Sequence, residues 1–318
     1  MKNFSLGQAW VSRVTNASGA DVSIIGGDVS QAPEIAHFHA VLREISLTET
    51  AREMVRRKWI QPKGIQDKVA ERGEALFDFL FARSAHKPAL AMFKGRRLMA
   101  QRDLVEEIAT MAWVAHVLDS ARANAPRVKF KPSNLSEDFI RKLAKLSVLD
   151  EGPTRALAAV REIGIGLVVE SGLPGMSVDG ASLHTSAAGP MLALTLRHDR
   201  LDNFWFTLLH ELGHIALHLS DPSDDVFIDS LEDTAIDEQE VEAEANAFAK
   251  DGLIPRDLWL RSDAYRLGSE GSVVNLAKQL GVHPAIVAGR IRYERRDFRI
   301  LTELVGVGGV RDVVFAAG

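Results

Sequence analysis

Two histidines and a glutamate stand at a spacing that suits metal-dependent hydrolysis. The segment HELGH runs from His210 to His214 inside the apolar stretch FWFTLLHELGHIALHL. Residues four apart project from the same face of a helix, because this spacing is just over one turn. A carboxylate directly after the first histidine completes the H-E-x-x-H arrangement, in which both imidazoles bind zinc and the glutamate is a general base. The segment therefore predicts His210 and His214 as zinc ligands and Glu211 as the catalytic carboxylate.

The helix that carries this segment is apolar almost all round, so we expect it to be buried apart from the face that bears the histidines. Two unpaired histidines and a glutamate inside a packed core would cost several kcal/mol in desolvation. A metal ion beside a solvent cleft would remove that cost. We expect Asp202 to cap the N-terminus of this helix.

A third protein ligand is needed, and the nearest histidine is a poor candidate. His218 lies four residues beyond His214. One straight helix does not easily aim three consecutive turns at a single tetrahedral ion. We therefore interpret His218 as a packing or supporting residue, and the missing ligand must come from another part of the chain.

A second helix downstream offers a carboxylate. Residues 221–244 contain eleven acidic side chains and no basic ones. We expect a solvated loop there, followed by a helix over about Asp237–Asp251 that Gly252 ends. Glu242 borders the apolar face of this helix, whereas Glu244 points roughly 200° away from it on a helical wheel. Both cannot face one ion, so Glu242 is the predicted third ligand.

Together, the segments FTLLHELGHIALH and EAEANAFAKDGLIP and the acidic linker between them resemble the ImmA/IrrE-type metallopeptidases, which are zinc proteases of bacteria and phages. The second segment is similar to the E-x-x-A-[ND]-x-F-A helix of that family. The resemblance covers roughly residues 130 to 260. It implies His210, His214 and Glu242 as ligands of Zn2+ and Glu211 as the catalytic carboxylate.

The segment before the metal site predicts an all-α domain, residues 1–128. We expect a helix that Thr48 caps, a second over Ile65–Arg83 and a third over about Gln101–Ala121. The two prolines of ANAPRVKFKPSN then break the helical pattern.

Residues 129–262 predict the zinc-metallopeptidase domain. Helices, a strand over Ile165–Glu170, a turn-rich loop and a strand over Met191–Leu196 precede the metal helix. This order indicates an α+β fold that is predominantly helical, with a small sheet beside the metal helix. We expect the strand Met191–Leu196 to pair along its edge with an extended substrate peptide.

Residues 263–318 predict a C-terminal helical segment. Val273–Leu280 and Pro284–Tyr293 are spaced like a helix-turn-helix. GVHPAIVAGRIRYE, in the same region, resembles a segment that often follows the peptidase domain in antitoxin-like members. Many such members also carry an N-terminal helix-turn-helix of the phage-repressor type, whose pattern residues 1–128 do not show. Five arginines would make one face basic, so DNA contact and a plain helical cap on the peptidase cleft are both open: Arg290, Arg292, Arg295, Arg296 and Arg299.

A donor to the tetrahedral oxyanion is usual in acyl-transfer sites. Four residues are candidates, although the pattern favours a plain surface role for each of them: His184, His198, His283 and Tyr293.

Composition limits the compartment and the partners. The chain has 318 residues, 46% hydrophobic content and no cysteine, which excludes disulfides and thiolate metal sites. The N-terminus lacks the apolar core of a signal peptide, and no apolar run approaches the ~18 residues of a membrane span, so we expect a cytoplasmic protein. A net charge of −5 does not favour wholesale binding to nucleic acid.

Three functions remain open from the sequence. The first is a zinc endopeptidase that cleaves a cytoplasmic regulatory protein, for which the resemblance implies a phage-type helix-turn-helix repressor or an antitoxin. The second is a DNA- or partner-binding regulator that keeps zinc but has little proteolytic activity. The intact Glu211 speaks against the second, because structural zinc sites are usually closed by four protein ligands. The third is a helical interaction protein with a fortuitous motif.

Overall fold

The computed structural model describes most of the chain from residue 101 onward and parts of the segment before it. The described residues are 49–61, 72, 75, 76, 79, 80, 101–123, 125–185, 189–219, 226–228 and 236–316. The chain divides into two compact units, Met1–Phe79 and Leu80–Gly318. Most of the helix predicted over Ile65–Arg83 lies outside the described residues, and the domain limits at residues 128 and 262 stay predictions.

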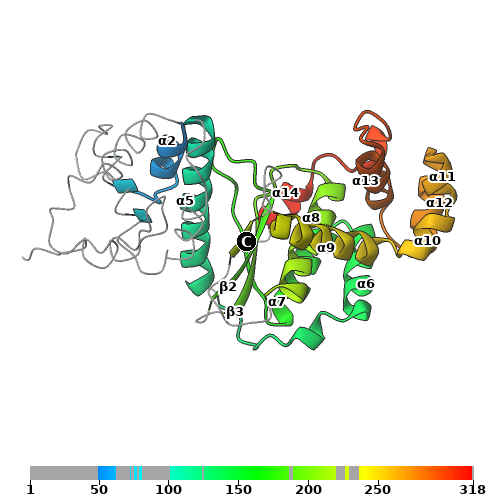
Figure 1. The fold of residues 1–318 in the computed structure, drawn as a ribbon, viewed down its shortest axis with the longest axis horizontal. Coiled ribbons are helices and arrows are strands. Elements are labelled where there is room, and N and C mark those ends of the chain that lie inside the picture. The colour runs from blue at the N-terminus through cyan, green and yellow to red at the C-terminus, as the bar shows by residue number, and fades with distance from the viewer. Residues whose placement is uncertain are drawn as a thin grey trace, which may run out of the picture. The chain divides into compact units, whose positions relative to one another are not determined.

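The fold is α+β and mostly helical, as predicted (Figure 1). In the first unit, α2 covers Glu49–Arg56. The helices of the second unit are α5 (Gln101–Ala123), α6 (Glu137–Lys145), α7 (Gly152–Glu162), α8 (Leu201–Leu217), α9 (Ile236–Leu253), α10 (Arg256–Arg261), α11 (Asp263–Leu267), α12 (Glu270–Leu280), α13 (Pro284–Arg295) and α14 (Val310–Ala316).

A small mixed sheet packs beside the helix of the HELGH motif. Its strands are β1 (Gly166–Val169), β2 (Gly180–Thr185), β3 (Gly189–Leu194) and β4 (Val226–Ile228), in the order β1-β3-β2-β4. β3 pairs in parallel with β1 and antiparallel with β2, and β2 pairs antiparallel with β4.

The sheet corrects the prediction in two respects. β2 and β4 were not predicted, because β2 follows directly on the turn-rich loop and β4 lies in the acidic stretch that reads as a solvated loop. β3 is an interior strand, with β1 on one side and β2 on the other. Its backbone is therefore already paired, and the predicted pairing of this strand with a substrate peptide is wrong.

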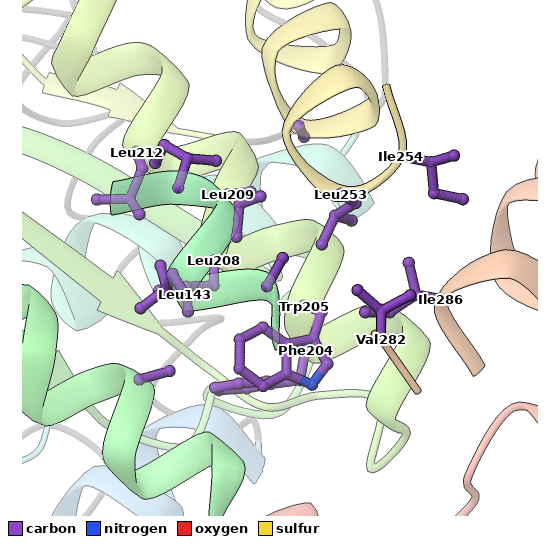
Figure 2. Close-up of a cluster of buried hydrophobic side chains, with 14 of the residues drawn as sticks. Leu143, Phe204, Trp205, Leu208, Leu209, Leu212, Leu253, Ile254, Val282 and Ile286 are labelled. Atoms are coloured by element: carbon purple, nitrogen blue, oxygen red, sulfur yellow. The ribbon is translucent and has the colours of Figure 1, made fainter. Parts of the chain in front are cut away.

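The core is built around α8. This helix packs against α9 and α13 on one side and against β2 and β3 on the other. Large side chains from its buried faces meet side chains of α6, α9 and α13 (Figure 2). The buried residues of α8 in this cluster are Phe204, Trp205, Leu208, Leu209, Leu212 and Ile215.

A glycine permits the close approach of α8 and α9. A Cβ atom at Gly213 would lie 3.2 Å from both the Ala245 Cα and the Phe248 side chain, tighter than most contacts of this kind. Any larger residue at this position would push the two helices apart. Gly213 thus lets α9 lie close enough to α8 to bring its own side chains to the histidines.

The start of α8 and the end of α9 differ from the prediction. Arg200, not Asp202, is the N-cap residue of α8, and Asp202 lies in the first turn, where both of its oxygens accept hydrogen bonds from the Arg200 guanidinium. α9 continues through Gly252 to Leu253 instead of ending at the glycine. The reason is packing, because a Cβ at Gly252 would lie 2.7 Å from the Ile140 side chain.

The C-terminal helices form as predicted, but their arginines do not make one basic face. Gly281 ends α12 in the left-handed conformation and His283 caps α13. Arg290 donates to the carbonyl oxygens of α9 and its C-terminus, and Arg292 is buried at 5% exposure. Burial lowers the pKa of Arg292, and the neighbouring Asp202 carboxylate opposes this shift. Two of the five arginines therefore face the interior of the fold and not a common solvent-exposed surface.

Within the part of the chain that the structure describes, no helix is long and apolar enough to cross a lipid bilayer.

Candidate metal centre

Two helices bring together the three residues predicted as ligands. His210 and His214 project from α8, and Glu242 projects from the facing side of α9. The two Nε2 atoms lie 3.0 Å apart. Glu242 Oε2 is 3.2 Å from His210 Nε2, and Glu242 Oε1 is 3.3 Å from His214 Nε2. One nitrogen from each imidazole and the carboxylate thus converge on one point.

These separations fit a tetrahedral zinc ion. Zinc–ligand bonds of about 2.0–2.2 Å place neighbouring tetrahedral ligand atoms roughly 3.3–3.5 Å apart. The three observed separations, 3.0, 3.2 and 3.3 Å, come within a few tenths of an ångström of that value. Among the described residues, this is the group of histidine and acidic side chains close enough to share a metal ion. Three protein ligands leave a fourth position for water or substrate.

The electrostatics of the cluster favour the protonation states that a metal requires. Burial by itself raises the pKa of Glu242, but hydrogen bonds from His210 and His214 outweigh burial and hold this pKa at about 2. Burial lowers the pKa of His214, although the carboxylate of Glu242 opposes that shift. At neutral pH the carboxylate is therefore ionised and the His214 imidazole is neutral, as metal ligands must be.

Glu211 follows the first ligand and is fully buried. The hydroxyl of Ser182, on β2, donates to Glu211 Oε2 at 2.6 Å and also approaches the Glu211 carbonyl oxygen at 2.8 Å. Gly180, on the same strand, leaves room for the carboxylate, because a Cβ there would lie 2.4 Å from Glu211 Oε1. β2 thus fixes the position of the predicted catalytic carboxylate.

Sequence reasoning missed this role of β2. A strand that follows a turn-rich loop and carries small residues gives no signal that its Gly180 and Ser182 face a glutamate of α8. The only available clue was the combination of glycine and serine two residues apart, which lie on one face if the segment is a strand.

His218 takes the supporting position predicted for it. Its ring centroid is 5.7 Å from that of His214, and its Nε2 is 3.6 Å from Glu244 Oε2. Glu244 is therefore directed at His218, whereas Glu242 faces the two ligand histidines.

Of the four candidate oxyanion donors, Tyr293 is linked to the site through stacked aromatic rings. Its ring stacks on Phe206 with 6.2 Å between centroids, and Phe206 in turn stacks on His210 at 6.0 Å. His283 is occupied as the cap of α13, where its Nδ1 accepts from the Ala285 backbone N–H. The backbone of His184 pairs with Pro190 of β3 at the end of β2, and the His198 ring contacts the Arg197 guanidinium.

The comparisons with known proteins agree with this geometry. Residues 164–292 match the family model of the IrrE N-terminal-like domain, Peptidase_M78. This range contains β1–β4, α8 and α9. It also contains the three predicted ligands, His210, His214 and Glu242, together with Glu211. No curated protein matches the chain. Residues 164–292 are therefore a domain of the IrrE N-terminal-like type, which confirms the resemblance of the two motifs to the ImmA/IrrE-type family.

Proposed function

We propose that the chain is a zinc-dependent endopeptidase that hydrolyses a peptide bond in a cytoplasmic regulatory protein. The observation that supports this most is the convergence of the two histidine Nε2 atoms and the two Glu242 carboxylate oxygens, with separations of 3.0–3.3 Å. Glu211, the residue after His210, has its carboxylate held by Ser182. A purely structural zinc site would normally be closed by a fourth protein ligand.

The chemistry divides between the ion and the side chains. A zinc ion held by His210, His214 and Glu242 supplies Lewis-acid activation of a water molecule and of the peptide carbonyl. Glu211 accepts the proton from the attacking water and delivers it to the leaving amine. Ser182 keeps the Glu211 carboxylate oriented for both transfers through its 2.6 Å hydrogen bond.

The substrate class rests on the family resemblance. We propose a phage-type helix-turn-helix repressor or an antitoxin, encoded near this gene. Recognition of such a protein does not need the chain to bind DNA. Of the arginines that would have formed a basic face, Arg292 is buried, and Arg290 is partly buried and donates to backbone carbonyls.

The test compares wild type with Glu211→Gln. We expect both proteins to hold zinc, and only wild type to cleave a purified repressor from a neighbouring gene. Equal cleavage by Glu211→Gln would remove the general-base assignment. Zinc without cleavage by either protein, together with a salt-sensitive gel shift of DNA, would favour the regulator over the peptidase.

A further inference from the structure

A cavity opens beside the metal centre, between α8, α9 and α13. Its volume is about 120 Å³. The apolar part of its wall is formed by three aromatic and three aliphatic side chains: Phe206, Tyr293, Phe298, Leu253, Ile254 and Ile286. Figure 2 shows Leu253, Ile254 and Ile286 at the junction of α9 and α13.

One aromatic ring separates this cavity from the metal ligands. Phe206 lies one turn before His210 on α8, and the planes of the two rings are only 29° apart. The other neighbour of Phe206 is Tyr293 of α13, with an interplanar angle of 28°. Phe206 thus lines the cavity and also packs on His210, a predicted metal ligand. A substrate side chain bound in the cavity would therefore belong to a substrate residue that lies close to the metal.

Among the charged side chains that line the cavity, Lys250 is the cation that makes no ion pair with a described carboxylate. Asp202 is paired with Arg200, whose Nε donates to it at 2.8 Å. Arg290 is held by Glu294 at 2.9 Å and by backbone carbonyls. Lys250 Nζ lies 4.8 Å above the Tyr293 ring, and no ion pair of Lys250 occurs among the residues that the structure describes. Burial lowers the pKa of Lys250, and the carboxylates of Glu294 and Asp251 oppose this shift.

We propose that this cavity binds the side chain of a substrate residue that directly flanks the scissile bond, and that it selects a medium-sized apolar side chain such as leucine, methionine or phenylalanine. The inference rests on the proposed peptidase function. A cavity of about 150 Å³ lined by apolar side chains holds benzene, so about 120 Å³ suits an isobutyl or thioether group and is small for an indole. Lys250 disfavours lysine and arginine at the same position.

The first test reads cleavage sites in a peptide library made by digesting a bacterial proteome. Wild type should cleave next to leucine, methionine or phenylalanine at least about tenfold more often than next to glycine, as expected from burying such a side chain. Lys250→Glu should raise cleavage next to lysine and arginine about tenfold relative to leucine. Lys278→Glu, an exposed lysine of α12, is the charge-matched control and should leave the profile unchanged. Cleavage with no apolar preference, or an unchanged profile in Lys250→Glu, overturns the proposal.

The second test does not require catalysis. In a 15N NMR titration of the full chain, N-acetyl-leucine amide should shift the backbone amides of Phe206 and Gly289, which line the cavity, whereas N-acetyl-glycine amide and N-acetyl-lysine amide should not. Ile286→Trp, which fills much of the space, should abolish the leucine shifts, and its circular dichroism spectrum checks that it folds.

The two tests separate the proposals. Leucine-amide binding without any peptide cleavage would sink the peptidase function and keep the apolar side-chain site. No shift with the leucine amide would overturn the cavity assignment, whether or not the protein cleaves peptides.

Discussion

Gly180, which packs against the proposed catalytic carboxylate of Glu211, gives a sharp test of the site geometry. In Gly180→Ala the new methyl group would lie 2.4 Å from Glu211 Oε1 and 2.9 Å from its Cδ and Cγ atoms. Ordinary contacts of a Cβ atom begin at 3.4 Å, so the nearest oxygen must retreat by about 1 Å, from 2.4 to 3.4 Å. Gly180 has no positive φ, so alanine does not strain the strand, and the change falls on the carboxylate.

A displacement of about 1 Å in a catalytic group can cost roughly 100-fold in rate. We therefore expect Gly180→Ala to cleave a repressor or peptide substrate about 100-fold more slowly than wild type. The measurement is a single-turnover time course followed by mass spectrometry, together with the zinc content of each protein. Zinc should remain bound, because the substitution does not touch the three ligands.

Gly172→Ala is the matched control, because it lies in the loop before the same strand and its new methyl group would find its nearest neighbour at 3.8 Å. It should cleave at the rate of wild type. A Gly180→Ala protein that retains the wild-type rate would refute the placement of Glu211, and loss of zinc from it would show that the strand supports the ligands instead.

Three further predictions follow from the same contacts. Ser182→Ala should lower the single-turnover rate about tenfold, since a hydrogen bond to a charged group contributes about 1.5–3 kcal/mol. Ser182→Thr, which keeps a hydroxyl group, should recover much of that rate. Equal rates in wild type and both variants would contradict the positioning role of Ser182. Metal-free protein should become less stable to urea in two pH ranges. Below pH 6.5 the unfolded chain binds a proton at His214 more readily than the folded chain does, because the folded pKa is lowered. Between pH 4.5 and about 2 the same holds for Glu242. The stability difference between wild type and Glu242→Gln should therefore shrink over the lower range, and a difference independent of pH would contradict the assigned shift. Leu208→Ala, at a position with 0% exposure in α8, should reduce the free energy of unfolding by about 2–5 kcal/mol, and a loss under 1 kcal/mol in urea titration would argue against a packed helix there.

The sequence predicted those parts of the site that depend on local spacing. The four-residue interval between His210 and His214 places both imidazoles on one helical face wherever the helix lies. The choice of Glu242 over Glu244 also follows from helical geometry, because only one of them borders the apolar face of α9. The structure places Glu242 against both histidines and Glu244 against His218.

Contacts between distant segments could not be predicted. Strand order depends on which backbones pair across the whole domain, so β3 looked like an edge although β1 and β2 flank it. The support of Glu211 comes from Gly180 and Ser182 of β2, which are 31 and 29 positions before it in the chain. Arg290 and Arg292 looked like surface cations, because the residue type gives no indication of the carbonyl groups and the carboxylate that surround them after packing.

The central claim is that α8 and α9 together hold one zinc ion, and elemental analysis of the purified protein tests it most directly. We expect inductively coupled plasma mass spectrometry to find about one zinc per chain in wild type, as a single three-ligand site requires. His210→Ala and Glu242→Ala should each hold much less under the same purification. Wild-type protein without metal after purification in zinc-containing buffer, or full occupancy in both variants, would contradict the account.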